Sequence, residues 1–93
     1  MILSFADRDT ERLFRGGTCP ARWRSLERTA VRKLDMLDAA TALGDLRSPP
    51  GNRLEALKGE RHGQWSIRIN DQWRLCFRWD GEGPEAVEIV DYH

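Results

Sequence analysis

Three arginines, Arg68, Arg74 and Arg78, lie in two short segments, residues 64–70 and 73–79, in which apolar and polar residues alternate. Successive side chains of a β-strand point to opposite faces of a sheet, so this alternation predicts strands with one apolar and one polar face. The arginines fall on the polar face. Because a guanidinium can form paired hydrogen bonds to phosphate oxygens, we expect this face to bind a phosphate group.

The chain offers few ligands for a metal ion. Its two histidines, His62 and His93, and its two cysteines, Cys19 and Cys76, are scattered without the spacing of a zinc site or a CxxC motif. We therefore expect no metal site and no other cofactor. The cysteines are expected to be reduced thiols, because no pattern supports a disulfide.

Length and composition indicate a single globular domain over residues 1–93, with 40% hydrophobic and 32% charged residues. No apolar run is long enough to cross a membrane and residues 1–5 are too short for a signal peptide, so we expect a cytoplasmic protein without a membrane partner. The net charge is zero, but residues 47–79 carry seven basic and three acidic side chains, and residues 80–93 carry five acidic and no basic ones. A local basic patch is therefore expected in the middle of the chain.

The two alternating segments are expected to form a hairpin, because residues 70–72 make a short polar break between them. Residues 1–6, 53–58 and 86–92 are predicted to be further strands. The apolar face of the hairpin should form the core, with tryptophans that pack there rather than stack on bases: Trp65, Ile67, Ile69, Trp73, Leu75 and Phe77.

Two helices are predicted between the first and second strands. The first follows an aspartate cap, Asp7 or Asp9, and ends at the glycines of residues 16–17. The second is predicted over residues 18–43 and ends at Gly44. One face of it repeats at spacings of three and four: Trp23, Leu26, Ala30, Leu34, Leu37 and Thr41. The expected fold is α+β, a mostly antiparallel sheet of four or five strands with both N-terminal helices packed on one face.

Four further segments together carry a resemblance. They are Asn-Arg-Leu-Glu-Ala-Leu-Lys-Gly at 52–59, Gly-Gln-Trp-Ser-Ile at 63–67, Asn-Asp-Gln-Trp-Arg-Leu-Cys-Phe at 70–77 and the terminal Asp-Tyr-His at 91–93. With these segments the chain resembles the HigB-type toxins of the RelE/ParE superfamily, over nearly its whole length. The resemblance implies the small RelE-like fold.

The same resemblance implies a function. It implies a toxin of a type II toxin–antitoxin system, a ribosome-dependent and metal-independent endoribonuclease that cuts messenger RNA during translation and inhibits growth. The implied partners are a helix-turn-helix antitoxin, the ribosome and messenger RNA.

By position, the resemblance also implies a set of catalytic residues: Lys58, Arg74, Asp91, Tyr92 and His93. Arg53, Arg61 and Arg68 belong to the basic stretch and are expected to bind the substrate. One departure concerns Glu55, because some HigB toxins have a histidine at this position. That difference leaves His93 as the only imidazole of the matched set.

Cleavage of RNA without a metal needs a base for the 2′-hydroxyl proton, cations for the charge on the phosphate, and an acid for the leaving 5′-oxygen. His93 can be the base or the acid, because an imidazole titrates near neutral pH. Lys58 and Arg74 can hold the phosphate. Tyr92 can donate a hydrogen bond to the phosphate or stack on a base.

Several alternatives stay open at this point. Glu55 or Asp91 could act as the base or orient the histidine. The same fold could also carry a non-enzymatic inhibitor of DNA gyrase, as in the ParE branch, or a plain protein-interaction module. The terminal Asp-Tyr-His and Lys58 favour the ribonuclease, because an inhibitor does not need a titratable cluster.

Overall fold

A four-stranded antiparallel sheet forms the centre of the protein. The computed structural model describes residues 1–91, and the predicted site residues Tyr92 and His93 lie outside the described residues. Neighbouring strands of the sheet are also neighbours in the sequence, so three hairpins build it. The strands are β1 (Glu55–Ala56), β2 (Trp65–Arg68), β3 (Trp73–Trp79) and β4 (Pro84–Asp91).

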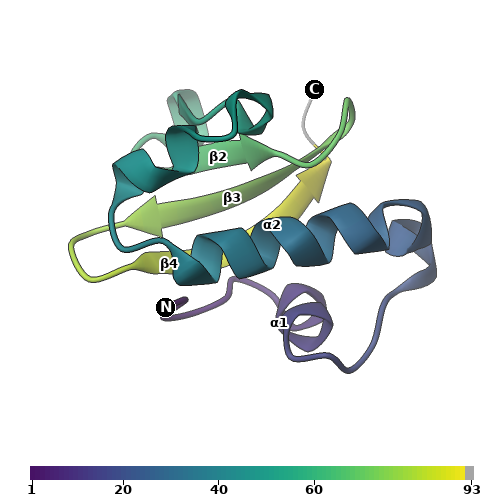
Figure 1. The fold of residues 1–93 in the computed structure, drawn as a ribbon. Helices are drawn as coiled ribbons and strands as arrows, with labels where there is room; N and C mark the ends of the chain where they lie inside the picture. Colours follow the sequence, from purple (N-terminus) through teal and green to yellow (C-terminus); the bar gives the residue numbers. More distant parts are fainter. Residues whose placement is uncertain (92–93) are drawn as a thin grey trace.

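Two α-helices cover one face of this sheet. Helix α2 (Glu27–Ala39) runs across the sheet, and helix α1 (Arg8–Phe14) lies beside it near β4 (Figure 1). The predicted α+β fold, with both helices on one face, is confirmed. The helix-covered face of the sheet is formed by Ile67, Ile69, Leu75, Phe77, Val87 and Ile89.

One apolar core joins the two layers. Leu75 and Phe77 of β3 are completely buried, as the alternation predicted, and they belong to one cluster with Trp23 and Leu34 of the helical layer. The rings of Trp23 and Trp73 meet edge to face, with centroids 6.5 Å apart and planes at 79°. Burial of each large side chain removes apolar surface from water and contributes on the order of 1.5–3 kcal/mol.

The predicted second helix starts in a different form. Residues Ala21–Leu26 make a 3₁₀ helix, η1, and the α-helix begins only at Glu27. Leu26, with φ −114° and ψ 3°, lies outside α-helical geometry and separates the two. The predicted stripe is nevertheless buried up to Leu37, because a 3₁₀ turn followed by an α-helix still directs it to one side: Trp23, Leu26, Ala30, Leu34 and Leu37.

The helix also ends earlier than predicted, at Ala39, and Ala40 follows it with extended backbone. The carboxylate of Asp45 accepts hydrogen bonds from the backbone N–H groups of Thr41 and Ala42, at 3.0 and 3.1 Å. These bonds start a new turn in place of a further turn of the helix. Among residues 1–91, no helix is long and apolar enough to cross a bilayer.

Residues 1–6 do not form the predicted strand. They run parallel to β4 and are joined to it by an isolated bridge between Phe5 and Val87. Toward the start of β4 one backbone hydrogen bond, from the N–H of Leu3 to the carbonyl of Pro84 at 2.8 Å, continues the contact without forming a regular strand pair. Pro84 has no N–H to donate, and the N–H of Ala86 donates to a serine hydroxyl at 2.9 Å.

The strand predicted over residues 53–58 is reduced to the two residues of β1. Arg53 adopts a left-handed conformation with φ 47°, which interrupts an extended strand. Gly59, with φ 66°, then turns the chain into the 3₁₀ helix η4 (Gly59–Arg61). The edge of the sheet is therefore short, and turns flank it on both sides.

A buried polar cluster fixes the connection from α2 to β1. This connection contains two 3₁₀ helices, η2 (Leu43–Arg47) and η3 (Pro50–Asn52). The side chain of Asn52 is completely buried; it donates to the carbonyl of Leu46 at 3.1 Å and accepts from Nζ of Lys33. Burial, together with two nearby arginines, lowers the pKa of Lys33. Because Asn52 is tied on both sides, the residues that precede β1 have a fixed position.

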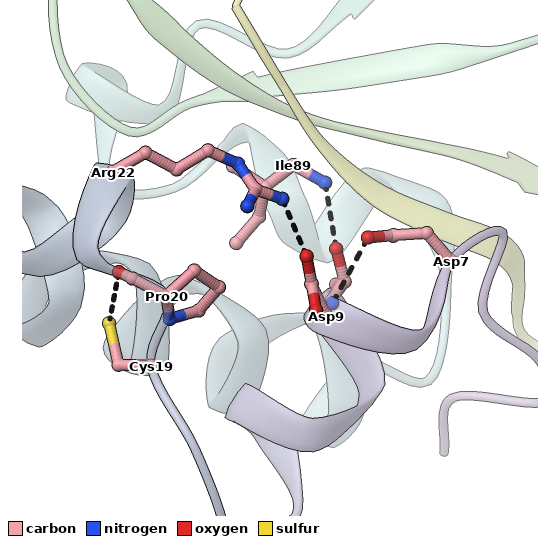
Figure 2. A network of polar contacts seen from close by, with 7 residues as sticks. Asp7, Asp9, Cys19, Pro20, Arg22 and Ile89 are labelled. Atoms are coloured by element: carbon pink, nitrogen blue, oxygen red, sulfur yellow. Dashed lines mark hydrogen bonds and ion pairs between the residues drawn. The ribbon is translucent and has the colours of Figure 1, made fainter.

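Helix α1 is tied to β4, as Figure 2 shows. Asp7 is the aspartate that caps this helix, and its carboxylate accepts from the N–H of Thr10 at 3.2 Å. The hydroxyl of Thr10 accepts from the N–H of Ile89 at 3.2 Å. Arg22 pairs with Asp9 at 2.7 Å and joins η1 to the same helix. Both helical elements are thereby held near the C-terminal half of β4.

Candidate active site

The face of the sheet opposite α2 carries the predicted arginines. Strand register places Ser66 beside Cys76 and Cys76 beside Glu88, and in the adjacent row it places Arg68 beside Arg74. Long polar side chains therefore lie next to one another across three strands. We call this surface the arginine face, and its residues are Ser66, Arg68, Arg74, Cys76, Arg78 and Glu88.

Arg74 is the most firmly held cation of the arginine face. Its Nε donates to Oγ of Ser66 at 2.8 Å, and its Nη2 donates to the backbone carbonyl of Arg53 at 2.7 Å. The nearest carboxylate oxygen, Oε2 of Glu55, is 3.9 Å from Nη2. The side chain of Arg74 is 12% exposed. Its two hydrogen-bond acceptors are neutral and orient the guanidinium, whereas its ion pair with Glu55 is long at 3.9 Å and offsets the charge only weakly.

Two other predicted cations are paired with carboxylates. Arg61 donates from Nη2 to Glu88 at 2.9 Å and from Nη1 to Gln64 at 3.0 Å. Arg68 forms an ion pair with Asp71, in the turn between β2 and β3. A phosphate at these two arginines would have to share them with an existing partner, which makes them weaker anchors than Arg74.

Two further predicted cations flank β1. Arg53 precedes this strand and Lys58 follows it, and both residues are exposed. Within residues 1–91, neither side chain makes a hydrogen bond or an ion pair, so both charges are available to a ligand. Lys58 is not brought into contact with Arg74.

Asp91 lies at the end of β4, and the register separates it from Arg74. Its partner across the strands is Trp73, whereas the partner of Arg74 is Val90. Side chains alternate along a strand, so Asp91 belongs to the same side of the sheet as Trp73. Its carboxylate accepts from the amide of Gln72 at 3.0 Å. The register therefore places the side chains of Asp91 and Arg74 on opposite faces of the sheet.

Sequence reasoning missed the groups that hold Arg74. Ser66 lies on the predicted polar face, and this position could have indicated a hydroxyl near the arginines. The carbonyl of Arg53 leaves no signal in the side-chain pattern. It comes into reach because Arg53 adopts a left-handed conformation just before β1.

Cys76 lies on the arginine face and is completely buried. Burial raises the pKa of its thiol from 9.0 to about 11; Arg61 opposes this shift and Glu88 adds to it. The thiol therefore stays protonated near neutral pH and is a poor nucleophile there. Cys76 is part of the packing beneath the charged side chains.

A hollow of about 520 Å³ lies elsewhere, on the helical layer, lined by Arg24, Glu27, Arg28 and Val31. It shares no residue with the arginine face. Its charged side chains are exposed, whereas Arg74 is held by two hydrogen bonds, so Arg74 is the stronger candidate for a site. Within residues 1–91, no group of three or more histidine, cysteine, aspartate or glutamate side chains could hold a metal ion.

Known proteins resemble this chain along its whole length. A family model described as the RelE-like toxin of the type II toxin–antitoxin system HigB matches residues 3–93. The chain is 46% identical over 97 residues to "Toxin HigB-1" of Vibrio cholerae serotype O1, covering 100% of this chain and 98% of that protein. It is 33% identical over 94 residues to "Endoribonuclease HigB" of Proteus vulgaris, covering 100% of both.

A solved structure shares the fold. The "YoeB/ParE toxin from Agrobacterium tumefaciens" aligns with a TM-score of 0.50 and 21% sequence identity, over 99% of this chain and 98% of that chain. At this identity the likeness concerns the arrangement of helices and strands.

Proposed function

The chain belongs to the RelE-like HigB toxins of type II toxin–antitoxin systems, and we propose that it is an endoribonuclease whose Arg74 holds the scissile phosphate. The activity is supported by a full-length relative that is named an endoribonuclease. The observation that carries the assignment to Arg74 is its guanidinium, held by Ser66 and by the carbonyl of Arg53, two neutral acceptors. A cation held in this way is preorganised for a phosphate and keeps its charge.

The substrate we propose is messenger RNA on a translating ribosome, in the cytoplasm. Arg53 and Lys58 have exposed and unpaired charges, which suits contact with successive phosphates of an RNA strand. The arginine face lies on the outside of the sheet, and a polymer can follow such a surface. We propose a helix-turn-helix antitoxin as the second partner, and within the family a placement near the GraT toxin, a HigB-like member.

The reaction we propose needs no metal. The 2′-oxygen attacks phosphorus while a base takes its proton, the bond from phosphorus to the 5′-oxygen breaks, and an acid gives that oxygen a proton. Arg74, with Lys58, balances the negative charge that develops on the phosphate. His93 is our choice for proton transfer, with Tyr92 as a donor to the phosphate and Asp91 as a supporting group.

The distribution of ion pairs ranks the substrate-binding arginines. Arg61 and Arg68 already have carboxylate partners, so their side chains contribute less to RNA binding than Arg53. Glu55 lies close enough to Arg74 to serve as an alternative base. Mutation of Glu55 and of Asp91, each alone, separates Glu55 as the base from Asp91 as a supporting group.

The test is cleavage of messenger RNA on programmed ribosomes, read as new 5′ ends. Arg74→Ala should lose roughly 10²-fold or more in rate, the loss typical of removing one preorganised donor to a developing oxyanion. His93→Gln should lose a similar factor, roughly 10²-fold, as expected for a general acid or base. Arg24→Ala, at an exposed arginine of η1, is the matched control and should cleave normally.

The melting temperature and binding of the antitoxin should change little in Arg74→Ala, since Arg74 lies outside the apolar core, and both are measured for His93→Gln as well. Normal cleavage after removal of both Arg74 and His93 would overturn the proposal. Growth inhibition without any RNA cleavage would favour the gyrase-inhibiting alternative.

A further inference from the structure

We infer that Ser66 is a positioning residue that, with the carbonyl of Arg53, holds the guanidinium of Arg74 in the orientation needed for catalysis. The inference rests on the proposed function of Arg74. Ser66 is completely buried, and its Oγ accepts from Nε of Arg74 at 2.8 Å. A buried hydroxyl with a charged donor at this distance is a strong and specific contact.

The sheet fixes the position of the Ser66 hydroxyl. Ser66 lies inside β2, between its cross-strand partners Glu55 on β1 and Cys76 on β3. Its backbone is therefore held from both sides. The second acceptor is fixed as well, because Asn52 anchors the turn in which Arg53 adopts its left-handed conformation.

The pattern of donors leaves room for a phosphate. A guanidinium has five N–H groups in a rigid fork, and the structure uses one on Nε and one on Nη2 of Arg74. Within residues 1–91 the N–H groups on Nη1 make no hydrogen bond, and Nη2 faces the carboxylate of Glu55 at 3.9 Å, too far for a hydrogen bond, so donors on both nitrogens can meet phosphate oxygens as a pair. Rotation of the guanidinium is restricted by the Nε contact to Ser66, which makes the direction of that pair depend on the serine.

The chemistry of the acceptors matters as much as their position. A carboxylate at Ser66 would hold Arg74 equally well but would cancel its charge. A hydroxyl and a carbonyl hold it and leave the charge to the transition state. Loss of the Ser66 hydroxyl should therefore act on the chemical step more than on binding, with a fall of about tenfold in kcat and a change in KM within roughly twofold.

The experiment compares Ser66→Ala with Cys76→Ala in cleavage on programmed ribosomes. The two residues are cross-strand partners on the same face, both completely buried, and only Ser66 bonds to Arg74. Ser66→Ala should lower kcat about tenfold. Cys76→Ala should lower the melting temperature at least as much while kcat stays normal. Ser66→Thr, which keeps the hydroxyl, should restore kcat.

A second background separates positioning from folding. Lysine lacks the guanidinium whose Nε–H bonds to Ser66. In the Arg74→Lys protein the further change Ser66→Ala should therefore have no effect on kcat. An equal loss in both backgrounds would overturn the inference. If Ser66→Ala does not fold, kcat is measured in both backgrounds for Ser66→Cys, which replaces the oxygen with a larger sulfur that is only a weak acceptor.

The outcomes distinguish this inference from the proposed function. Full activity of Arg74→Ala would remove the proposed function, and the inference with it. A strong loss in Arg74→Ala together with full activity of Ser66→Ala would remove the inference alone.

Discussion

On the helix-covered face of β3, Leu75 and Phe77 are completely buried among apolar side chains, whereas on the arginine face of the same strand Arg74 is held by hydrogen bonds to two neutral groups. The first face is stabilised by removal of apolar surface from water, a term that is large and has no direction. The second depends on directional contacts, which fix the orientation of a side chain as well as its position. The two faces of β3 therefore differ in role: the helix-covered face stabilises the fold, and the arginine face holds charged side chains in defined orientations.

The arginine face is nevertheless packed. Ser66 and Cys76 are completely buried on it, beneath charged side chains that include Arg74 and the pair of Arg61 with Glu88. Long arginine side chains can cover a surface with their stems while their charged ends reach the solvent. The face is thus dry at its base and charged at its surface.

Truncation of one residue on each face of β3 should show the largest difference between the two faces. Phe77→Ala should lower the free energy of unfolding by about 3–5 kcal/mol, because a completely buried ring leaves a cavity. Arg78→Ala, its neighbour on the other face, should cost less than about 1 kcal/mol. Urea unfolding followed by circular dichroism measures both. Equal losses would contradict the division between the two faces.

A pH titration tests whether the base of the arginine face is dry. Burial raises the pKa of the Cys76 thiol from 9.0 to about 11, so the folded protein keeps this proton where the unfolded chain has lost it. The stabilising contribution is complete below pH 9 and is lost as the pH rises toward about 11. The slope should reach about 1.4 kcal/mol per pH unit at most.

The measurement is urea unfolding between pH 8 and 11 for the natural protein and for Cys76→Ala. Cys19 and Lys33 also have shifted pKa values, but both residues are present in the two proteins and cancel in the difference. If the free energy of unfolding depends on pH in the same way in the natural protein and in Cys76→Ala, water reaches the thiol of Cys76.

The helix-covered face could be predicted almost completely from the sequence. Period-two alternation assigned Leu75 and Phe77, and the spacing of three and four assigned Trp23 and Leu34, because both patterns follow from the geometry of a single element. The break at Leu26 could not be predicted, since nothing in the residue types there excludes a continuous helix.

The arginine face could be predicted only in part, because its contacts join distant elements. Arg61 and Glu88 are 27 residues apart, and Arg74 is bonded to a backbone carbonyl 21 residues away. The face of the sheet to which Glu85 belongs, relative to Glu88, depends on a bulge in β4, where Ala86 has φ 51°. An extra residue in a strand reverses its alternation, and no residue type reports it reliably.

The ion pair between Arg61 and Glu88 allows a test with a smaller expected effect, on the binding of RNA alone. Glu88→Gln keeps the shape of the side chain but removes the charge that neutralises Arg61. We expect ribosome binding to strengthen a few-fold at low salt, with a plot of log affinity against log salt that is steeper by about one. Stability should fall by less than about 1 kcal/mol.

Glu11→Gln is the matched control, because Glu11 pairs with Arg15 on α1, away from the arginine face. It should leave the salt dependence unchanged. If the slope of log affinity against log salt is the same for Glu88→Gln and Glu11→Gln, Arg61 is not part of the RNA-binding surface.

The smallest expected effect separates the backbone of Arg53 from its side chain. Arg53 has φ 47°, a conformation that glycine adopts readily, so Arg53→Gly keeps the carbonyl in place for Arg74 and removes only the cation. We expect a rise of a few-fold in KM for RNA cleavage, a normal kcat and a change in stability within about 1 kcal/mol. Arg53→Val removes the same charge, but a β-branched residue is strained in this conformation. The carbonyl should then move, and kcat should fall as well. If glycine and valine have the same effect on kcat, the carbonyl of Arg53 has no part in holding Arg74.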